Sequence, residues 1–155
     1  MENATITRLG LTSSAFQDGQ PIPVQYTCDG ADQSPPLAWS EMPQGTKSLA
    51  LIVDDPDAPS GLFRHWGAYD IPPDTRSIAA GQAIGKQAAN SFGKPGYGGP
   101  CPPKGHGTHH YHFKIYALDS DALDVPANSK IEDVETSAQR PIIGRGELIG
   151  TYERI

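Results

Sequence analysis

Proline and glycine divide this 155-residue chain into short apolar segments, with 15 prolines and 17 glycines in all. Proline fixes the backbone φ angle and lacks an amide donor, so a segment with several prolines cannot lie inside a helix. This distribution favours a fold rich in strands and loops over disorder. We expect one domain, residues 1–155, because a chain of this length can bury a single core.

Stiff backbone coincides with polar side chains in three places. These segments are Asp54 to Pro59, Gly99 to Pro103 and His109 to Phe113. Stiff loops at the ends of strands are common positions for binding groups. The sequence therefore predicts one preorganised polar pocket.

The charge and the apolar runs exclude several classes of partner. A net charge of −6 argues against nucleic acid and against an anionic membrane surface. Residues 1–16 lack the pattern of a signal peptide, and no run reaches the roughly 18 apolar residues of a membrane span. We expect a cytoplasmic protein with no integral membrane segment, in which Cys28 and Cys101 are free thiols.

Hydrophobic patterns predict strands and one helix. A helix should follow the capping-box spacing of Ser129 and Glu132 and end before Pro141. Residues 74–108 form a long irregular connection of the kind that often serves a function. The predicted strands are 22–27, one that starts within 34–39, the continuous apolar run 48–53, 63–71, 109–118 and 147–152.

Alternation along residues 109–118 assigns side chains to two faces. His109 and Tyr111 share a face with Phe113 and Ile115, so they should lie at the rim of the core. Asp55 follows the apolar run 48–53 and should leave the core beside them. With His65, these residues would offer donors to a small oxyanion, or donors and one carboxylate to a zwitterion.

Simpler explanations exist for the same residues. Asp57 is in a typical turn sequence, and a single histidine such as His65 is usually a hydrogen-bonded core residue. Cys101, His109 and Asp55 could form a nucleophilic triad, but Cys101 lies between two prolines and not at a helix N-terminus. A histidine cluster from His106 to His112 suggests a metal, yet its members face opposite ways and lack zinc spacing, so we expect no metal.

Several motifs together resemble the phosphatidylethanolamine-binding protein family, also called Raf kinase inhibitor-like proteins, in its short bacterial and archaeal branch. The resemblance runs from about Thr5 to Arg154. The motifs are Tyr26 to Gly30, Ser34 to Leu37, Asp55 to Pro59, His65-Trp66, Gly99 to Pro103, His109-x-Tyr111-x-Phe113 and Leu148 to Tyr152.

The resemblance implies a fold and a site. The fold would be a mainly β sandwich with a large antiparallel sheet, a smaller sheet and one or two short helices. It also implies a cis peptide bond at Ala58–Pro59. The pocket for phosphate-type anions or phospholipid headgroups would be lined by Asp55, His65, Pro102, Pro103, His109 and Tyr111.

We therefore expect a binding protein that is not an enzyme and uses no cofactor. The alternative is an interaction module that inhibits a kinase or a protease, with contacts around residues 74–108. A cysteine hydrolase is a third, weaker alternative. The sequence allows a homodimer but does not indicate one.

Overall fold

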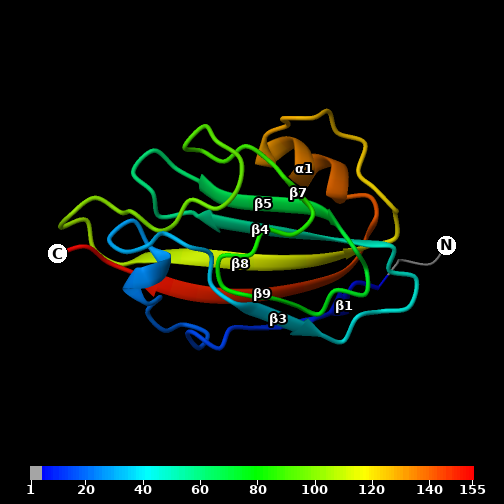
Figure 1. Cartoon of the computed structure of the whole chain (residues 1–155), viewed down its shortest axis with the longest axis horizontal. Helices are drawn as coiled ribbons and strands as arrows, with labels where there is room; N and C mark the ends of the chain where they lie inside the picture. The colour runs from blue at the N-terminus through cyan, green and yellow to red at the C-terminus, as the bar shows by residue number, and fades with distance from the viewer. Residues whose placement is uncertain (1–4) are drawn as a thin grey trace.

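The computed structural model describes residues 5–155, which form two β-sheets, one α-helix and one short 3-10 helix (Figure 1). The large sheet has the order β1 (Thr7–Arg8), β9 (Ile142–Tyr152), β8 (His109–Leu118), β4 (Ser48–Asp55), β5 (Phe63–Ile71) and β7 (Lys86–Gln87). The small sheet has the order β2 (Gly10–Thr12), β3 (Leu37–Ser40) and β6 (Ser77–Ile78). This architecture confirms the predicted fold class. The large sheet is mixed, because β1 runs parallel to β9.

The three central strands agree closely with the sequence prediction. β5 and β8 have the predicted bounds, and β4 extends the predicted run 48–53 by two residues, to Asp55. Every residue of β4 is buried, as a continuous apolar run suggests. β4 lies between β5 and β8, and Asp55 is its last residue.

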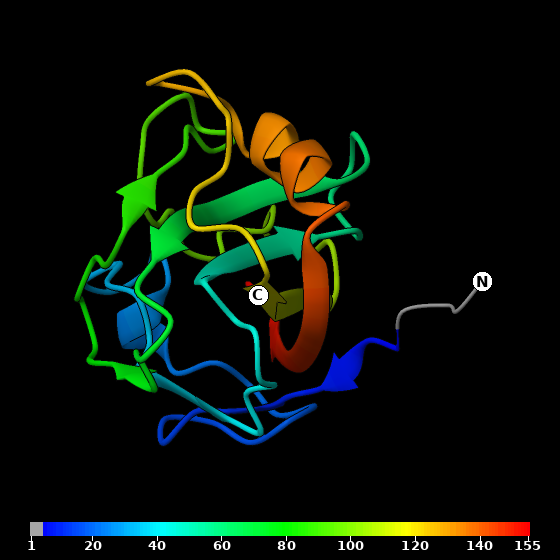
Figure 2. The same cartoon turned by 90° about the vertical axis from the view of Figure 1, so that its right-hand side faces the viewer.

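Two core clusters explain why β4 is buried on both faces. Leu49, Leu51 and Val53 of β4 join the cluster that lies between the two sheets. Ala50 and Ile52 join the second cluster, which contains residues of α1 (Ile131–Ala138). Figure 2 shows α1 against the β4–β5 part of the large sheet, well separated from the small sheet.

The predicted helix forms and buries one apolar face. Ile131, Val134 and Ala138 are its buried residues, and it ends before Pro141. Its N-cap is Lys130, one residue after the predicted cap, and the Asp133 carboxylate accepts a hydrogen bond from the Lys130 N–H at 3.2 Å. No helix in residues 5–155 is long and apolar enough to cross a bilayer.

The predicted strand 22–27 is wrong. Val24–Tyr26 form the 3-10 helix η1, in which the Tyr26 N–H donates to Pro23 O at 3.1 Å. Ile22 and Val24 gave the appearance of strand alternation. However, Pro23 has no amide to donate to a sheet, and Val24 is exposed.

The sequence prediction missed the first half of β9 because several of its inward residues are glycines. The strand starts at Ile142, not at residue 147, and its inward positions include Gly144, Gly146 and Gly150. Neighbouring segments approach this face closely, since a Cβ on Gly146 would lie 2.6 Å from the backbone oxygen of Leu9. A strand whose inward residues lack side chains shows no apolar alternation.

This close contact predicts the effect of Gly146→Ala. The added methyl group would meet backbone, which cannot turn aside, so the free energy of unfolding should fall by about 1–3 kcal/mol. Urea denaturation measures the change. Glu147→Ala, on the exposed face of the same strand, is the control and should stay within about 0.5 kcal/mol of the parent. Equal stability of both variants would contradict the close packing.

Candidate functional site

A cavity of about 240 Å³ lies where β4 ends and where β5 and β8 begin. All six residues that the sequence analysis selected line it: Asp55, His65, Pro102, Pro103, His109 and Tyr111. Its walls are completed by residues that the sequence analysis did not select, namely Ala58, Pro59, Ser60, Phe63, Phe92 and Cys101. Segments far apart in the sequence therefore converge on one small site.

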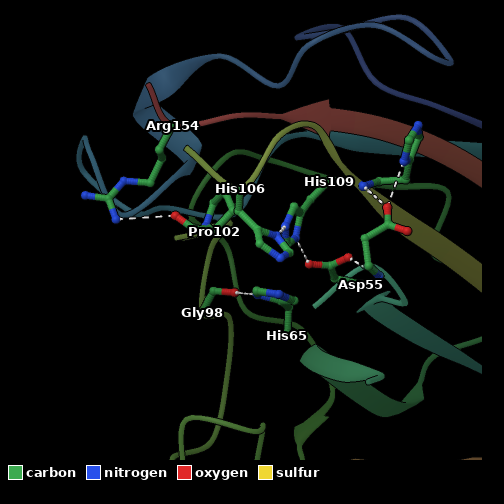
Figure 3. Close-up of polar contacts among 9 residues, drawn as sticks. Asp55, His65, Gly98, Pro102, His106, His109 and Arg154 are labelled. Carbon is green, nitrogen blue, oxygen red and sulfur yellow. Dashed lines mark hydrogen bonds and ion pairs between the residues drawn. The ribbon is translucent and has the colours of Figure 1, made fainter. Parts of the chain in front are cut away.

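A buried pair of side chains joins β4 to β8 inside the cavity. The Asp55 Oδ2 atom lies 2.6 Å from His109 Nδ1, and both side chains are almost fully buried (Figure 3). A carboxylate accepts hydrogen bonds, so Nδ1 of His109 carries the proton. This bond fixes the tautomer and the orientation of the imidazole.

The second ring nitrogen of His109 also has a partner. His109 Nε2 lies 2.6 Å from Nδ1 of His106, which is exposed on the loop between Pro103 and β8 (Figure 3). The sequence analysis considered His106 only as a member of a metal cluster. Its contact depends on the path of this loop, which sequence spacing does not specify.

His65 is both hydrogen-bonded and part of the cavity wall. Its Nδ1 donates to the Gly98 carbonyl oxygen at 2.7 Å. A carbonyl oxygen can only accept, so Nε2 is an acceptor whenever the ring is neutral. Burial lowers the pKa of His65, and this favours the neutral ring. His65 can therefore donate to a ligand only after it takes up a proton.

Tyr111 provides a donor that is free for a ligand. Its side chain is buried, and within residues 5–155 its hydroxyl has no hydrogen-bond partner. Burial, and then the charge of Asp55, raise the pKa of Tyr111 far above its ordinary value, so the hydroxyl keeps its proton. The ring packs edge-on against His65, with 5.2 Å between centroids.

Aromatic rings form one side of the cavity. Phe63 contacts both His65 and Phe92, with 4.8 Å between ring centroids in each pair. Phe92 comes from the long connection 74–108 and is 46% exposed. These rings give a largely apolar wall beside the polar groups.

One residue of the cavity wall, Cys101, is part of a disulfide bond. Cys101 is bonded to Cys28, so the prediction of free thiols is wrong. The two segments lie side by side, because the Cys28 N–H donates to Pro100 O at 3.1 Å. That adjacency joins residues 73 apart in sequence and could not be read from two isolated cysteines.

Arg154 supports the same wall. Its guanidinium lies 3.1 Å from Asp29 Oδ1 and 3.5 Å from the Pro102 carbonyl oxygen. The C-terminal segment therefore contacts Pro102, one of the two prolines that line the cavity. A sulfur that is part of a disulfide is not a thiolate nucleophile, so the bond removes the group that a cysteine hydrolase would need.

The turn after β4 differs from the expectation at Ala58–Pro59. No peptide bond in residues 5–155 is cis, so that prediction is wrong. The chain reverses through a turn in which the Gly61 N–H donates to Ala58 O at 3.0 Å, with a positive φ at Gly61. Asp55 Oδ1 accepts the Asp57 N–H at 2.8 Å and stabilises the start of this turn.

Asp57 takes part in the turn and not in the cavity lining. Its carboxylate accepts both the N–H and the ring Nδ1–H of His110, each at 2.8 Å. The hydrogen bond from the His110 side chain is the main cause that lowers the pKa of Asp57. In the described part of the chain, no three His, Cys, Asp or Glu residues form a group that could hold a metal ion. The absence of a metal stays a prediction.

Comparison with known proteins identifies relatives over almost the whole chain. The model of the family described as phosphatidylethanolamine-binding protein matches residues 12–153. A UPF0098 protein of Aquifex aeolicus is 47% identical over 92% of this chain and 86% of its own. A Mycobacterium tuberculosis protein named as a proposed lipoprotein, LppC, is 46% identical over 94% of this chain and 72% of its own.

A solved structure supports the same relationship. The crystal structure of Escherichia coli YbcL, described as a new member of the mammalian PEBP family, has a TM-score of 0.89 and 33% identity. The alignment covers 95% of this chain and 99% of that one.

Counting free thiols tests whether the Cys28–Cys101 disulfide forms. Unreduced protein, denatured and treated with a thiol reagent, should show no free thiol, and reduction should release two. Because the bond closes a loop of more than 70 residues, the double variant Cys28→Ser/Cys101→Ser should lose roughly 4 kcal/mol of stability in the chain-entropy model. Two reactive thiols before reduction would show that the bond does not form.

Proposed function

This chain belongs to the phosphatidylethanolamine-binding protein family, and we propose that its cavity binds small phosphate-type anions or phosphorylated headgroups. The observation that carries the proposal is the buried Asp55–His109 pair in the cavity. Asp55 holds His109 in one orientation before any ligand arrives. A donor that is already oriented costs less entropy when it binds.

The other lining groups fit the two ends of a zwitterionic headgroup. The Tyr111 hydroxyl and the protonated Nε2 atoms of His65 and His109 would donate to phosphate oxygens. The Asp55 carboxylate would accept from an amine. A volume of about 240 Å³ suits a headgroup better than a drug-sized molecule, which needs roughly 300–1,000 Å³.

The proline wall of the cavity, Pro102 and Pro103, supports ligand binding without catalysis. Pro102 follows the disulfide-bonded Cys101 and accepts a hydrogen bond from Arg154, and neither Pro102 nor Pro103 offers a reactive side chain. We propose a binding protein and not an enzyme. Inhibition of a kinase or protease, a homodimer, and a cytoplasmic location stay predictions. The disulfide favours an oxidising compartment instead of the cytoplasm.

The proposal predicts how sulfate binding depends on pH. An anion favours the charged imidazole, whereas burial lowers the pKa of His65 below its ordinary value and keeps the ring neutral near pH 7. Binding must therefore recruit protons, so affinity should be highest near pH 5 and fall as the pH rises to 8. Calorimetric titration at constant ionic strength measures it, since sulfate keeps its charge in this range.

A control variant and a competing ligand test whether the pH dependence comes from the cavity imidazoles. His112→Ala removes an imidazole on the opposite face of β8, where it pairs with Glu147, and should leave the pH profile unchanged. Phosphoethanolamine should displace sulfate. A sulfate affinity that is independent of pH would show that the imidazoles do not bind the anion.

Tyr111→Phe separates binding from stability. Because the hydroxyl has no partner in residues 5–155, its removal should change the free energy of unfolding by less than about 0.5 kcal/mol. It should weaken phosphate or sulfate binding by about 3- to 10-fold, the value of one neutral hydrogen bond. Calorimetry and urea denaturation give the two numbers. Unchanged affinity would remove Tyr111 from the site.

A further inference from the structure

His106 contacts the cavity through His109 and has no part in the proposed function so far. The two imidazole centroids are 4.9 Å apart, and the facing nitrogens, His106 Nδ1 and His109 Nε2, are 2.6 Å apart. Such a short contact needs one proton between the two nitrogens, since one must donate and the other accept. His106 therefore covers the nitrogen of His109 that a ligand would use.

The contact holds only while one of the facing nitrogens carries a proton and the other is bare. In the Asp55 contact His109 Nδ1 carries a proton, because it donates to the carboxylate. When both rings are fully protonated, two N–H groups and two positive charges face each other, and the contact becomes repulsive. Protonation of the second ring therefore opens the contact.

The loop that carries His106 can follow this change. Gly105 and Gly107 flank it with positive φ angles, and a Cβ on either would meet no atom within 4 Å. The loop remains attached on its N-terminal side, where the Gly105 N–H donates to Arg154 O at 2.8 Å. The exposed imidazole of His106 can thus swing outward without disturbing the buried core.

The opened pair carries two positive charges, and in residues 5–155 Asp55 is the only carboxylate that forms a hydrogen bond to either ring. Of the two rings, Asp55 from β4 bonds to His109 and not to His106, and Asp57, whose charge also acts on His109, makes its hydrogen bonds to His110. Lys104, on the same loop as His106, adds positive charge. Other titratable or charged groups near the pair come from β5, β8, β9 and the C-terminal segment: His65, Tyr111, Tyr152, Glu153 and Arg154.

We propose that His106 is a further anion-binding residue, which separates from His109 on protonation so that one oxyanion binds between the two imidazolium rings. This inference rests on the proposed function, because it adds a ligand-binding group to the same cavity. The anion takes the position of the shared proton and supplies the missing negative charge. Anion binding should then take up one proton more than it would if His109 and His65 were the only imidazoles in the site.

The experiment measures proton uptake with His106→Gln. Glutamine keeps a polar group that can contact His109 Nε2, but it cannot become charged. Sulfate titrations at pH 7 in two buffers of different ionisation enthalpy give the number of protons taken up. The parent should take up about one proton more than the variant. At pH 5.5 the variant should bind sulfate at least about tenfold more weakly, the loss of one charge-assisted hydrogen bond.

The outcomes distinguish this inference from the proposed function. If the parent itself does not bind sulfate at pH 5.5, the proposed function fails, and this inference fails with it. If the parent binds but His106→Gln matches it in affinity and proton uptake, only the role of His106 is overturned. Tighter binding by the variant would also overturn it, because His106 would then only compete with the anion. His112→Ala is the matched control and should behave as the parent.

Discussion

The buried hydrogen bond between Asp55 and His109 is the interaction on which the site depends. It exists because β4 and β8 pair over seven residues, from Ser48 opposite Leu118 to Asp54 opposite His112. That register places the end of one strand beside the start of the other. A buried carboxylate without a partner is costly, so the pair also requires the two strand ends to stay together.

The two neighbouring carboxylates at the end of β4, Asp54 and Asp55, have different partners. Successive side chains of a strand point to opposite faces, so Asp54 and Asp55 diverge. Asp54 lies 2.7 Å from Lys114 Nζ on the face away from the cavity, whereas Asp55 meets His109 inside it. One partner is a cation on β8 and the other is an imidazole that can gain or lose a charge. Asp54 therefore joins two strands on the face away from the cavity, whereas Asp55 lines the cavity itself.

The sequence predicts the central sheet well because its strands carry their own pattern. The apolar run of β4, the aromatic stretch of β5 and the alternation of β8 are each local signals. Alternation along β8 also placed His109 and Tyr111 on the core side, where both are buried. Local patterns failed at Pro23 and at the inward glycines of β9, such as Gly146, where neighbouring segments decide the structure.

The candidate site was predictable to the extent that its residues lie in motifs. The resemblance selected the six lining residues, and the structure places all of them around one cavity. The Cys28–Cys101 bond and the His106–His109 contact were missed, because both depend on how loops cross in space. A loop path is fixed by long-range hydrogen bonds, such as the one from Gly105 to Arg154, which leave no periodic trace in sequence.

The two cavity imidazoles are anchored in the same way, through Nδ1. His65 donates this proton to Gly98 O, and His109 donates it to Asp55. Gain or loss of the proton on Nε2 breaks neither bond, so titration changes the charge of the cavity without loosening its walls. Capture and release of the proposed anion would then require no rearrangement of the sheet. Their rates would follow the rotation of one exposed side chain, on the timescale of a surface loop and not of a folding transition.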